Sequence, residues 1–279
     1  MKLLIFGDVF GKLGRAGVKI MLPKWREKFS PDVVIANIEN IAHGKGIGIK
    51  QINELKEAGV NIFTGGNHSL EGKDFEKVLN DETVPVLRPA NIPASPAGGP
   101  NAPGRGALVY EVKTTGKKLL VINLIGQVFM RSEYENPFLA ADKILEEYGN
   151  ETPYKILDWH ADATSEKTVM GWYLDGKVSA VFGTHSHVPT ADAKILPKGT
   201  AYISDIGMVG PLNSVIGVEI EPSIKRFKDK IKTKMDPIEN GPIEVNAIFV
   251  ELEDDTARSE LCRTVDIRHL REIIPAGKI

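Results

Sequence analysis

Two of the six histidines in this 279-residue chain lie one residue apart, in the stretch GTHSHVPTAD at residues 183–192. Imidazole binds transition metals and exchanges protons near neutral pH, so His185 and His187 have the chemistry of a functional site. A pair with this spacing also arises by chance in chains of this length and is weak evidence alone. The pair directly follows VSAVF (178–182), an apolar, strand-like run.

Other polar residues able to bind metals or transfer protons also follow strand-like runs. They are Asp8 after LLIF, Glu39 and Asn40 at the end of DVVIANIEN, Asn67 and His68 after NIFT, and His160 after YKILDW. In an open α/β sheet the carboxyl ends of the strands form one rim, where ligands bind. Taken alone, Asp8 and Asn67 are typical turn residues, Glu39 and Asn40 could be a solvated corner, and His160 could be a hydrogen-bonded interior histidine. Their recurrence at five strand ends predicts one shared site.

The side chains of this predicted site are imidazoles, carboxylates and amides. Imidazole, carboxylate and amide oxygen without thiolate is a ligand set for Fe, Mn, Zn or Co, whereas calcium or magnesium alone would not recruit histidines. Eight candidate residues exceed the needs of one ion, which favours two ions that share a carboxylate. Two such ions assist in-line displacement at phosphorus and supply hydroxide at neutral pH.

Strand-like runs alternate with helical patterns over most of the chain. The expected strands are residues 2–6, 32–37, 60–64, 117–124, 154–159, 178–182 and 200–204. The expected helices are residues 14–29, 49–58, 71–80, 137–148 and 163–174. This alternation predicts an α/β core with helices on both faces. Residues 85–106 are rich in proline and glycine and are expected to form a surface loop.

The C-terminal part of the chain has a different pattern. Residues 214–220 and 242–254 are strand-like, and a lysine-rich, helical stretch, 221–234, lies between them. This mixture predicts a second sheet or an antiparallel extension of the first. His269 lies in a charged tail and is expected to be exposed. We expect residues 1–279 to form a single domain.

Composition narrows the class of protein. The hydrophobic fraction of 42% and the charged fraction of 26% are ordinary for a soluble protein, and the net charge of −2 gives no field that attracts duplex nucleic acid or an anionic membrane. No apolar stretch approaches the ~20 residues of a membrane span, and a cytoplasmic protein is expected. One cysteine excludes a disulfide framework and a thiolate zinc site. The proline-rich loop and the tail offer surface for a homo-oligomer.

Taken in order, these motifs resemble those of the calcineurin-like metallophosphoesterases. The closer resemblance is to the YmdB-like family, through NIEN, GGNH, NLIGQVFM, DWHADATSEK, GTHSHVPTAD and TAYISDIGMVGP. It covers residues 1 to about 220. The resemblance implies a four-layer α/β/β/α sandwich, in which two mixed sheets are flanked by helices.

The resemblance also implies how the site residues are divided. Asp8 and His187 would bind the first metal, Glu39 would bridge both metals, and His68 would stay free beside the phosphate. The second metal would be bound by Asn67, His160 and His185. The broader superfamily has Asp-x-His where this chain has Phe10, and in the YmdB-like subset the amide matching Asn40 takes the vacant place. An amide oxygen is a harder ligand than imidazole, which favours iron or manganese over zinc at the first metal.

The reaction implied by the resemblance is phosphodiester hydrolysis, with cyclic nucleotides, especially 2′,3′-cyclic nucleoside phosphates, as substrates. A hydroxide that bridges the metals would attack phosphorus, and His68 would act as the general acid. Two alternatives stay open at this stage. One is a phosphomonoesterase or protein phosphatase with the same metals, and the other is a non-enzymatic regulator that binds a nucleotide.

Overall fold

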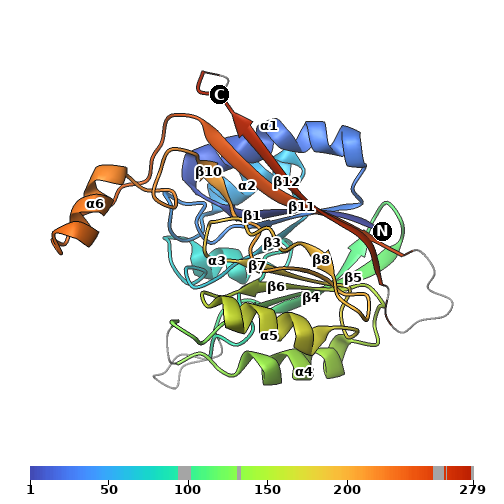
Figure 1. The fold of residues 1–279 in the computed structure, drawn as a ribbon. Coiled ribbons are helices and arrows are strands. Elements are labelled where there is room, and N and C mark those ends of the chain that lie inside the picture. The colour runs from blue at the N-terminus through green and yellow to red at the C-terminus, as the bar shows by residue number, and fades with distance from the viewer. Residues whose placement is uncertain (94–101, 131–132, 254–260, 262, 278–279) are drawn as a thin grey trace.

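Two mixed sheets of six strands each form the centre of the molecule (Figure 1). The structure, a computed structural model, describes residues 1–93, 102–130, 133–253, 261 and 263–277. The first sheet has the order β12-β11-β10-β1-β2-β3. Its strands are β1 (Lys2–Val9), β2 (Val33–Asn37), β3 (Ile62–Thr64), β10 (Met208–Pro211), β11 (Ile243–Leu252) and β12 (Thr264–Ile274). Strands β10, β1, β2 and β3 are parallel, and β11 and β12 extend the sheet antiparallel.

The second sheet has the order β4-β5-β6-β7-β9-β8. Its strands are β4 (Ala107–Val112), β5 (Lys117–Ile125), β6 (Lys155–His160), β7 (Ala180–Thr184), β8 (Lys194–Ile195) and β9 (Ala201–Ile203). The four central strands are parallel, and the edge strands β4 and β8 are antiparallel to their neighbours. The parallel strands are buried on both faces, which explains their nearly continuous apolar sequences.

Three apolar cores define four layers. Along β1, Leu4 and Phe6 face the helices, whereas Leu3 and Ile5 pack between the two sheets, as the two-residue period of a strand requires. The helices on the first sheet are α1 (Gly11–Phe29), α2 (Ile49–Ala58) and α3 (Phe75–Leu79), and those on the second are α4 (Pro137–Tyr148) and α5 (Thr164–Leu174). The predicted α/β/β/α sandwich of two mixed sheets flanked by helices is confirmed.

Helix α1 packs closely on the first sheet because its inner face carries glycine. A Cβ atom at Gly14 would lie 2.4 Å from the carbonyl oxygen of Val209, far inside van der Waals contact. Trp25 on the same helix stacks on Phe6 of β1, with ring centroids 5.5 Å apart. This packing fixes β1, and with it Asp8, relative to the helical layer.

Several expected elements differ from the structure. Residues 214–220 form no strand: Ile216 and Gly217 have positive φ angles, and Ser214 Oγ bonds across the turn to Pro211 and Gly217. The helix expected at 71–80 spans only 75–79, because the chain turns at Gly72 with φ +99°. The helix expected at 221–234 is α6 (Ile220–Lys228), and the positive φ of Lys230 lies just beyond its end.

Other expectations concern the edges of the sheets. Strands β4, β8, β10 and β12 were not expected, whereas β11 matches the strand expected at 242–254.

His269 is not exposed on a tail: it lies in β12, half-buried, and its Nε2 is 3.0 Å from the carbonyl oxygen of Ile206. Of the loop expected at 85–106, residues 94–101 lie outside the described part. Within the described residues, no helix combines the length and apolar character needed to cross a bilayer.

Candidate metal centre and active site

The predicted site residues come together at the carboxyl ends of strands from both sheets. Asp8 is the penultimate residue of β1, and His160 is the last residue of β6. Glu39 follows β2, Asn67 follows β3, and His185 follows β7. The candidate site therefore lies where the rims of the two sheets meet, and each sheet supplies part of it.

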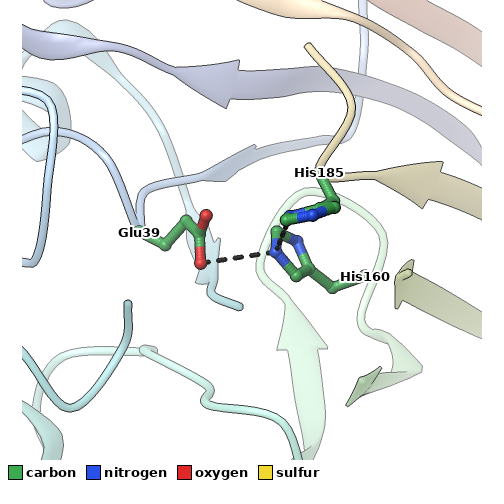
Figure 2. Close-up of side chains that lie close together, drawn as sticks. All are labelled: Glu39, His160 and His185. Carbon is green, nitrogen blue, oxygen red and sulfur yellow. Dashed lines mark hydrogen bonds and ion pairs between the residues drawn. The ribbon is translucent and has the colours of Figure 1, made fainter. Parts of the chain in front are cut away.

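Three potential ligand atoms surround the Nε2 atom of His160. Asn67 Oδ1 lies 3.0 Å from it, His185 Nδ1 3.1 Å and Glu39 Oε2 3.4 Å. Figure 2 shows Glu39 facing the two histidines, whose rings meet edge to face. Glu39, His160 and His185 offer ligand atoms within 4.8 Å of one another and form a group able to hold a metal ion.

A buried hydrogen-bond chain orients the ring of His160. Thr184 Oγ1 donates to Asp158 Oδ1 at 2.7 Å, and His160 Nδ1 is 2.9 Å from the same hydroxyl. Because the Thr184 hydroxyl donates its proton to the Asp158 carboxylate, its oxygen must accept a proton from His160 Nδ1. Nε2 is then left with a lone pair directed at Asn67, His185 and Glu39, which is the tautomer that a metal ligand requires.

The family resemblance assigns Asp8, Asn40 and His187 to a second group of candidate ligands. Asn40 and His187 are in contact, whereas Asp8 Oδ1 lies beside the other group, 4.0 Å from His160 Nδ1. His187 Nδ1 donates to the carbonyl oxygen of Ile216 at 2.9 Å, which again leaves Nε2 as the free ring atom. That atom is 3.3 Å from Asn40 Nδ2, and Asn40 Nδ2 donates to Glu39 Oε1 at 2.9 Å. The two carboxylate oxygens of Glu39 thus face one group each, as a bridging ligand would.

The Phe10 ring lies beside this second group and meets the His187 ring edge to face, with ring centroids 5.7 Å apart. In this structure it is the amide nitrogen of Asn40, not its oxygen, that points at His187 and Glu39. The amide side chain is close enough to both to belong to the site. The role of its oxygen as a ligand stays a prediction.

Asp8 and Glu39 are buried, and among the described residues neither carboxylate forms an ion pair with a lysine or arginine. Asp8 Oδ2 accepts a hydrogen bond from the backbone N–H of His185, but Asp8 Oδ1 is buried and accepts none from the described residues. Burial and the nearby Asp205 raise the pKa of Asp8 to about 7. Burial and Asp8 raise the pKa of Glu39 to about 8. These features are consistent with a metal site. A bound cation would contact the unpaired oxygen of Asp8 and would favour the ionised form of both carboxylates.

A buried ion pair supports the loop that carries the two histidines. Lys167 Nζ lies 2.5 Å from Asp205 Oδ2 and donates to the carbonyl oxygen of Thr184 at 2.9 Å. Asp205 Oδ2 also accepts the N–H of Ser186. His185 and His187 have positive φ angles of 102° and 66°, a conformation that costs free energy for residues other than glycine and needs such support.

The orienting residues Thr184, Asp158, Lys167 and Asp205 were not among the predicted site residues. Thr184, Asp158 and Asp205 lie inside or directly after strands, where polar residues have several roles. Lys167 has the sequence signature of a solvated helix residue, yet it is buried. The only signal available was their occurrence inside the motifs DWHADATSEK, GTHSHVPTAD and TAYISDIGMVGP.

His68 lies at the edge of the site. Its side chain is 27% exposed, and its backbone N–H donates to Glu39 Oε2 at 2.9 Å. Its Nδ1 is 3.1 Å from Glu71 Oε1, and Glu71 also pairs with Lys45 at 2.9 Å. Burial would raise the pKa of Glu71, but the hydrogen bonds from Lys45 and His68 outweigh it and lower the pKa. The His68 ring therefore lies against a carboxylate that is itself paired with Lys45.

Comparison with known proteins decides the family. A family model described as "YmdB-like protein" matches residues 4–265. The chain belongs to the YmdB-like family. The match extends beyond residue 220, where the motifs found in the sequence end, and includes β11 and the start of β12.

Two known bacterial proteins are similar to this chain over nearly its whole length. The 2′,3′-cyclic-nucleotide 2′-phosphodiesterase of Bacillus subtilis strain 168 is 43% identical over 260 residues, which is 93% of this chain and 94% of that protein. The crystal structure of a novel phosphatase from Mycoplasma pneumoniae has 35% identity and a TM-score of 0.88, and the match covers 100% of this chain and 95% of that chain.

A more distant structure shares the fold alone. A calcineurin-like phosphoesterase from Bacillus subtilis has a TM-score of 0.53 at 12% identity, with coverage of 99% of this chain and 90% of that chain. The expected enzyme class of this YmdB-like chain, a phosphoesterase hydrolase, is confirmed. The roles of the individual site residues are still predictions.

Proposed function

We propose that this chain hydrolyses phosphodiester bonds and that 2′,3′-cyclic nucleotides are its substrates. The observation that carries the proposal is the approach of three potential ligand atoms to His160 Nε2, beside a Glu39 carboxylate that faces two groups. The name of the Bacillus subtilis relative, which is 43% identical, supports the choice of substrate.

We assign the candidate ligands to two metal ions. Asn67, His160 and His185 would hold one ion, Asp8, Asn40 and His187 the other, and Glu39 would contact both. The nitrogen and oxygen donor set favours iron or manganese, with zinc as the alternative. When bound, two such ions lower the pKa of water and neutralise the charge that develops on the phosphate oxygens.

His68 is the proposed general acid. When the ester bond at phosphorus breaks, the departing sugar oxygen is a poor leaving group and needs a proton. The partly exposed position of His68 at the edge of the site allows its ring to meet a substrate, and Glu71 contacts and orients the ring. A hydroxide, formed when water gives up a proton to solvent, would bond to phosphorus as the phosphorus–oxygen ester bond breaks, and the departing oxygen would take the proton of the His68 ring.

A His68→Ala variant tests this role. We expect its kcat toward 2′,3′-cyclic AMP to fall by about 10²- to 10⁴-fold, with the metal content unchanged because His68 is not an assigned ligand. Metal analysis and steady-state kinetics on the same preparation measure both quantities. His43→Ala is the matched control, because that side chain is 84% exposed, and it should retain full activity. Loss of metal from His68→Ala would contradict the assignment.

The competing function is phosphomonoester hydrolysis, which the similarity to the Mycoplasma pneumoniae phosphatase supports. Turnover of bis-nitrophenyl phosphate and of mono-nitrophenyl phosphate separates the two functions. We expect the diester to be hydrolysed faster, and 2′,3′-cyclic AMP to be preferred over 3′,5′-cyclic AMP. Faster hydrolysis of the monoester would replace our proposal with a phosphatase.

A further inference from the structure

One helix lies apart from the layered body of the molecule. Helix α6 projects from the sandwich near the strand ends (Figure 1). We call residues 217–238, which carry it, the arm. At its base the two segments of the arm bond to each other: Ile238 N–H donates to the carbonyl oxygen of Gly217 at 3.1 Å, and Glu219 N–H to that of Asp236 at 3.1 Å. The base of the arm is thus a defined structure and not a loose loop.

The arm presents an apolar stripe to solvent. Ile220, Ile224 and Phe227 are spaced by four and three residues, so they lie on one face of α6, and all three are exposed, Phe227 by 73%. The opposite face packs on the returning segment, where Thr233 Oγ1 donates to the carbonyl oxygen of Pro222 at 2.8 Å. A helix of nine residues is marginal in water and depends on packing for its stability. The exposed apolar stripe of α6 therefore indicates a face that packs on a partner.

Part of the arm, residues 225–234, is strongly basic. Residues 225–234 contain six lysine or arginine side chains and one acidic side chain, Asp229. The lysine and arginine side chains are exposed. A partner for this arm therefore needs an apolar patch that is bordered by acidic groups.

The outer face of α4 and α5 has these complementary properties. The two helices are adjacent, because Tyr173 Oη donates to Asp142 Oδ2 at 2.5 Å. Their outer face exposes Leu139, Val169 and Trp172, the last by 53%. Helix α4 adds the exposed acids Asp142, Glu146 and Glu147 against one lysine. This face is the outermost layer on the side of the second sheet, and α6 of the same chain lies away from it (Figure 1).

We propose that the arm of one copy of this chain docks on the α4–α5 face of a second copy. The apolar stripe of α6 would cover Trp172 and its neighbours, and the lysines of the arm would face the acids of α4. In a symmetric dimer the second arm makes the same contact in return. Direct pairing of two arms is disfavoured where it would bring the two basic stretches, residues 225–234, together. The proposal is independent of the catalytic function.

Sedimentation velocity of the full-length protein tests the proposal. The wild-type chain is expected to form dimers. Phe227→Glu removes the docking side chain and Trp172→Glu its acceptor, and each is expected to weaken dimerisation at least about thirtyfold, as loss of an interface hot spot does. Val265→Glu is the control, because Val265 is equally exposed but lies on β12, outside both faces. It should stay dimeric.

A mixing experiment separates this contact from other arrangements. Phe227→Glu retains an intact α4–α5 face and Trp172→Glu retains an intact arm, so the two monomeric variants should form a heterodimer when mixed. This result would also show that both variants are folded. A Trp172→Glu variant that still dimerises would overturn the proposal in favour of arm-to-arm pairing. A wild-type chain that is monomeric, or that associates only with anionic vesicles, would overturn it as well.

Discussion

The two groups of candidate metal ligands differ in how firmly the protein holds them. In the group around His160, one ring nitrogen meets three potential ligand atoms, and the other is fixed through Thr184 to the buried Asp158. In the group around His187, the Phe10 ring lies against the imidazole and offers no ligand atom, and the amide nitrogen of Asn40 faces the ring nitrogen. Because preorganised ligands bind metal more tightly, we expect the His160 group to hold its ion more firmly than the His187 group.

The carboxylate shared by both groups is the most sensitive position. Glu39→Gln keeps the shape of the side chain but removes the charge that faces both groups. We expect turnover of the cyclic nucleotide to fall at least about 10³-fold, because both ions lose a common ligand. Metal content measured on the same preparation should fall for both sites. Glu151→Gln, an exposed glutamate paired only with Lys118, serves as control; a Glu39→Gln enzyme that keeps both ions would refute the bridging role.

Removing one histidine from each group tests the predicted difference directly. His160→Ala is expected to lose its ion even in excess metal, and activity should fall by about 10²-fold or more. His187→Ala should lose activity at low metal concentration but recover part of it in excess Mn²⁺. Activity titrated against metal concentration for both variants gives the comparison. Equal recovery of the two variants would show that the two groups do not differ.

The orienting hydroxyl of Thr184 is expected to have a smaller effect. Thr184→Val keeps the shape of the side chain but breaks the chain from His160 to Asp158. We expect metal affinity of the His160 group to fall by about 10- to 100-fold, with the His187 group unchanged. Thr184→Ser should restore the affinity. Thr168→Val on α5 is the control, because this half-buried hydroxyl bonds to the carbonyl oxygen of Thr164 and not to His160. Equal weakening of both groups would indicate general destabilisation.

The pH dependence of stability in metal-free protein gives the smallest effect. Burial raises the pKa of Asp8 and Asp158 to about 7 and that of Glu39 to about 8. From about pH 6.5 to 8 the folded protein therefore releases protons that the unfolded chain has already lost, so stability falls as the pH rises. Burial lowers the pKa of His185 to about 4 and also that of His160 and His187, which opposes this trend only below about pH 6.5.

Thermal unfolding scans of metal-free protein measure this effect. The melting temperature should decline between about pH 6.5 and 8, and bound metal should remove the decline because a cation favours the ionised carboxylates. A melting temperature that rises over this range without metal would contradict the account.

The layered core and the meeting of the site residues were predictable from the sequence. Buried parallel strands such as β1 and β6 have nearly continuous apolar sequences, and polar residues after them mark the rim of the sheet. The edge strands were harder to predict. Only the first and last of the eleven residues of strand β12 are fully buried, so its sequence lacks the alternation that reveals a half-buried strand.

The supporting residues of the site were not predictable, for a physical reason. Lys167 and Asp205 satisfy each other in the interior, but a lysine is normally a surface residue, and its burial depends on a partner 38 positions away. Ile216 supplies a backbone carbonyl to His187, and its side chain carries no trace of that role. Contacts of this kind arise from tertiary structure and leave little signal in local sequence.

A metal titration of the stripped protein, followed by hydrolysis of 2′,3′-cyclic AMP, tests the central claim most directly. We predict two bound ions per chain with unequal affinities, no turnover in the stripped protein, and activity that appears as the weaker site fills. Full activity without metal, or full activity with a single bound ion, would contradict the account.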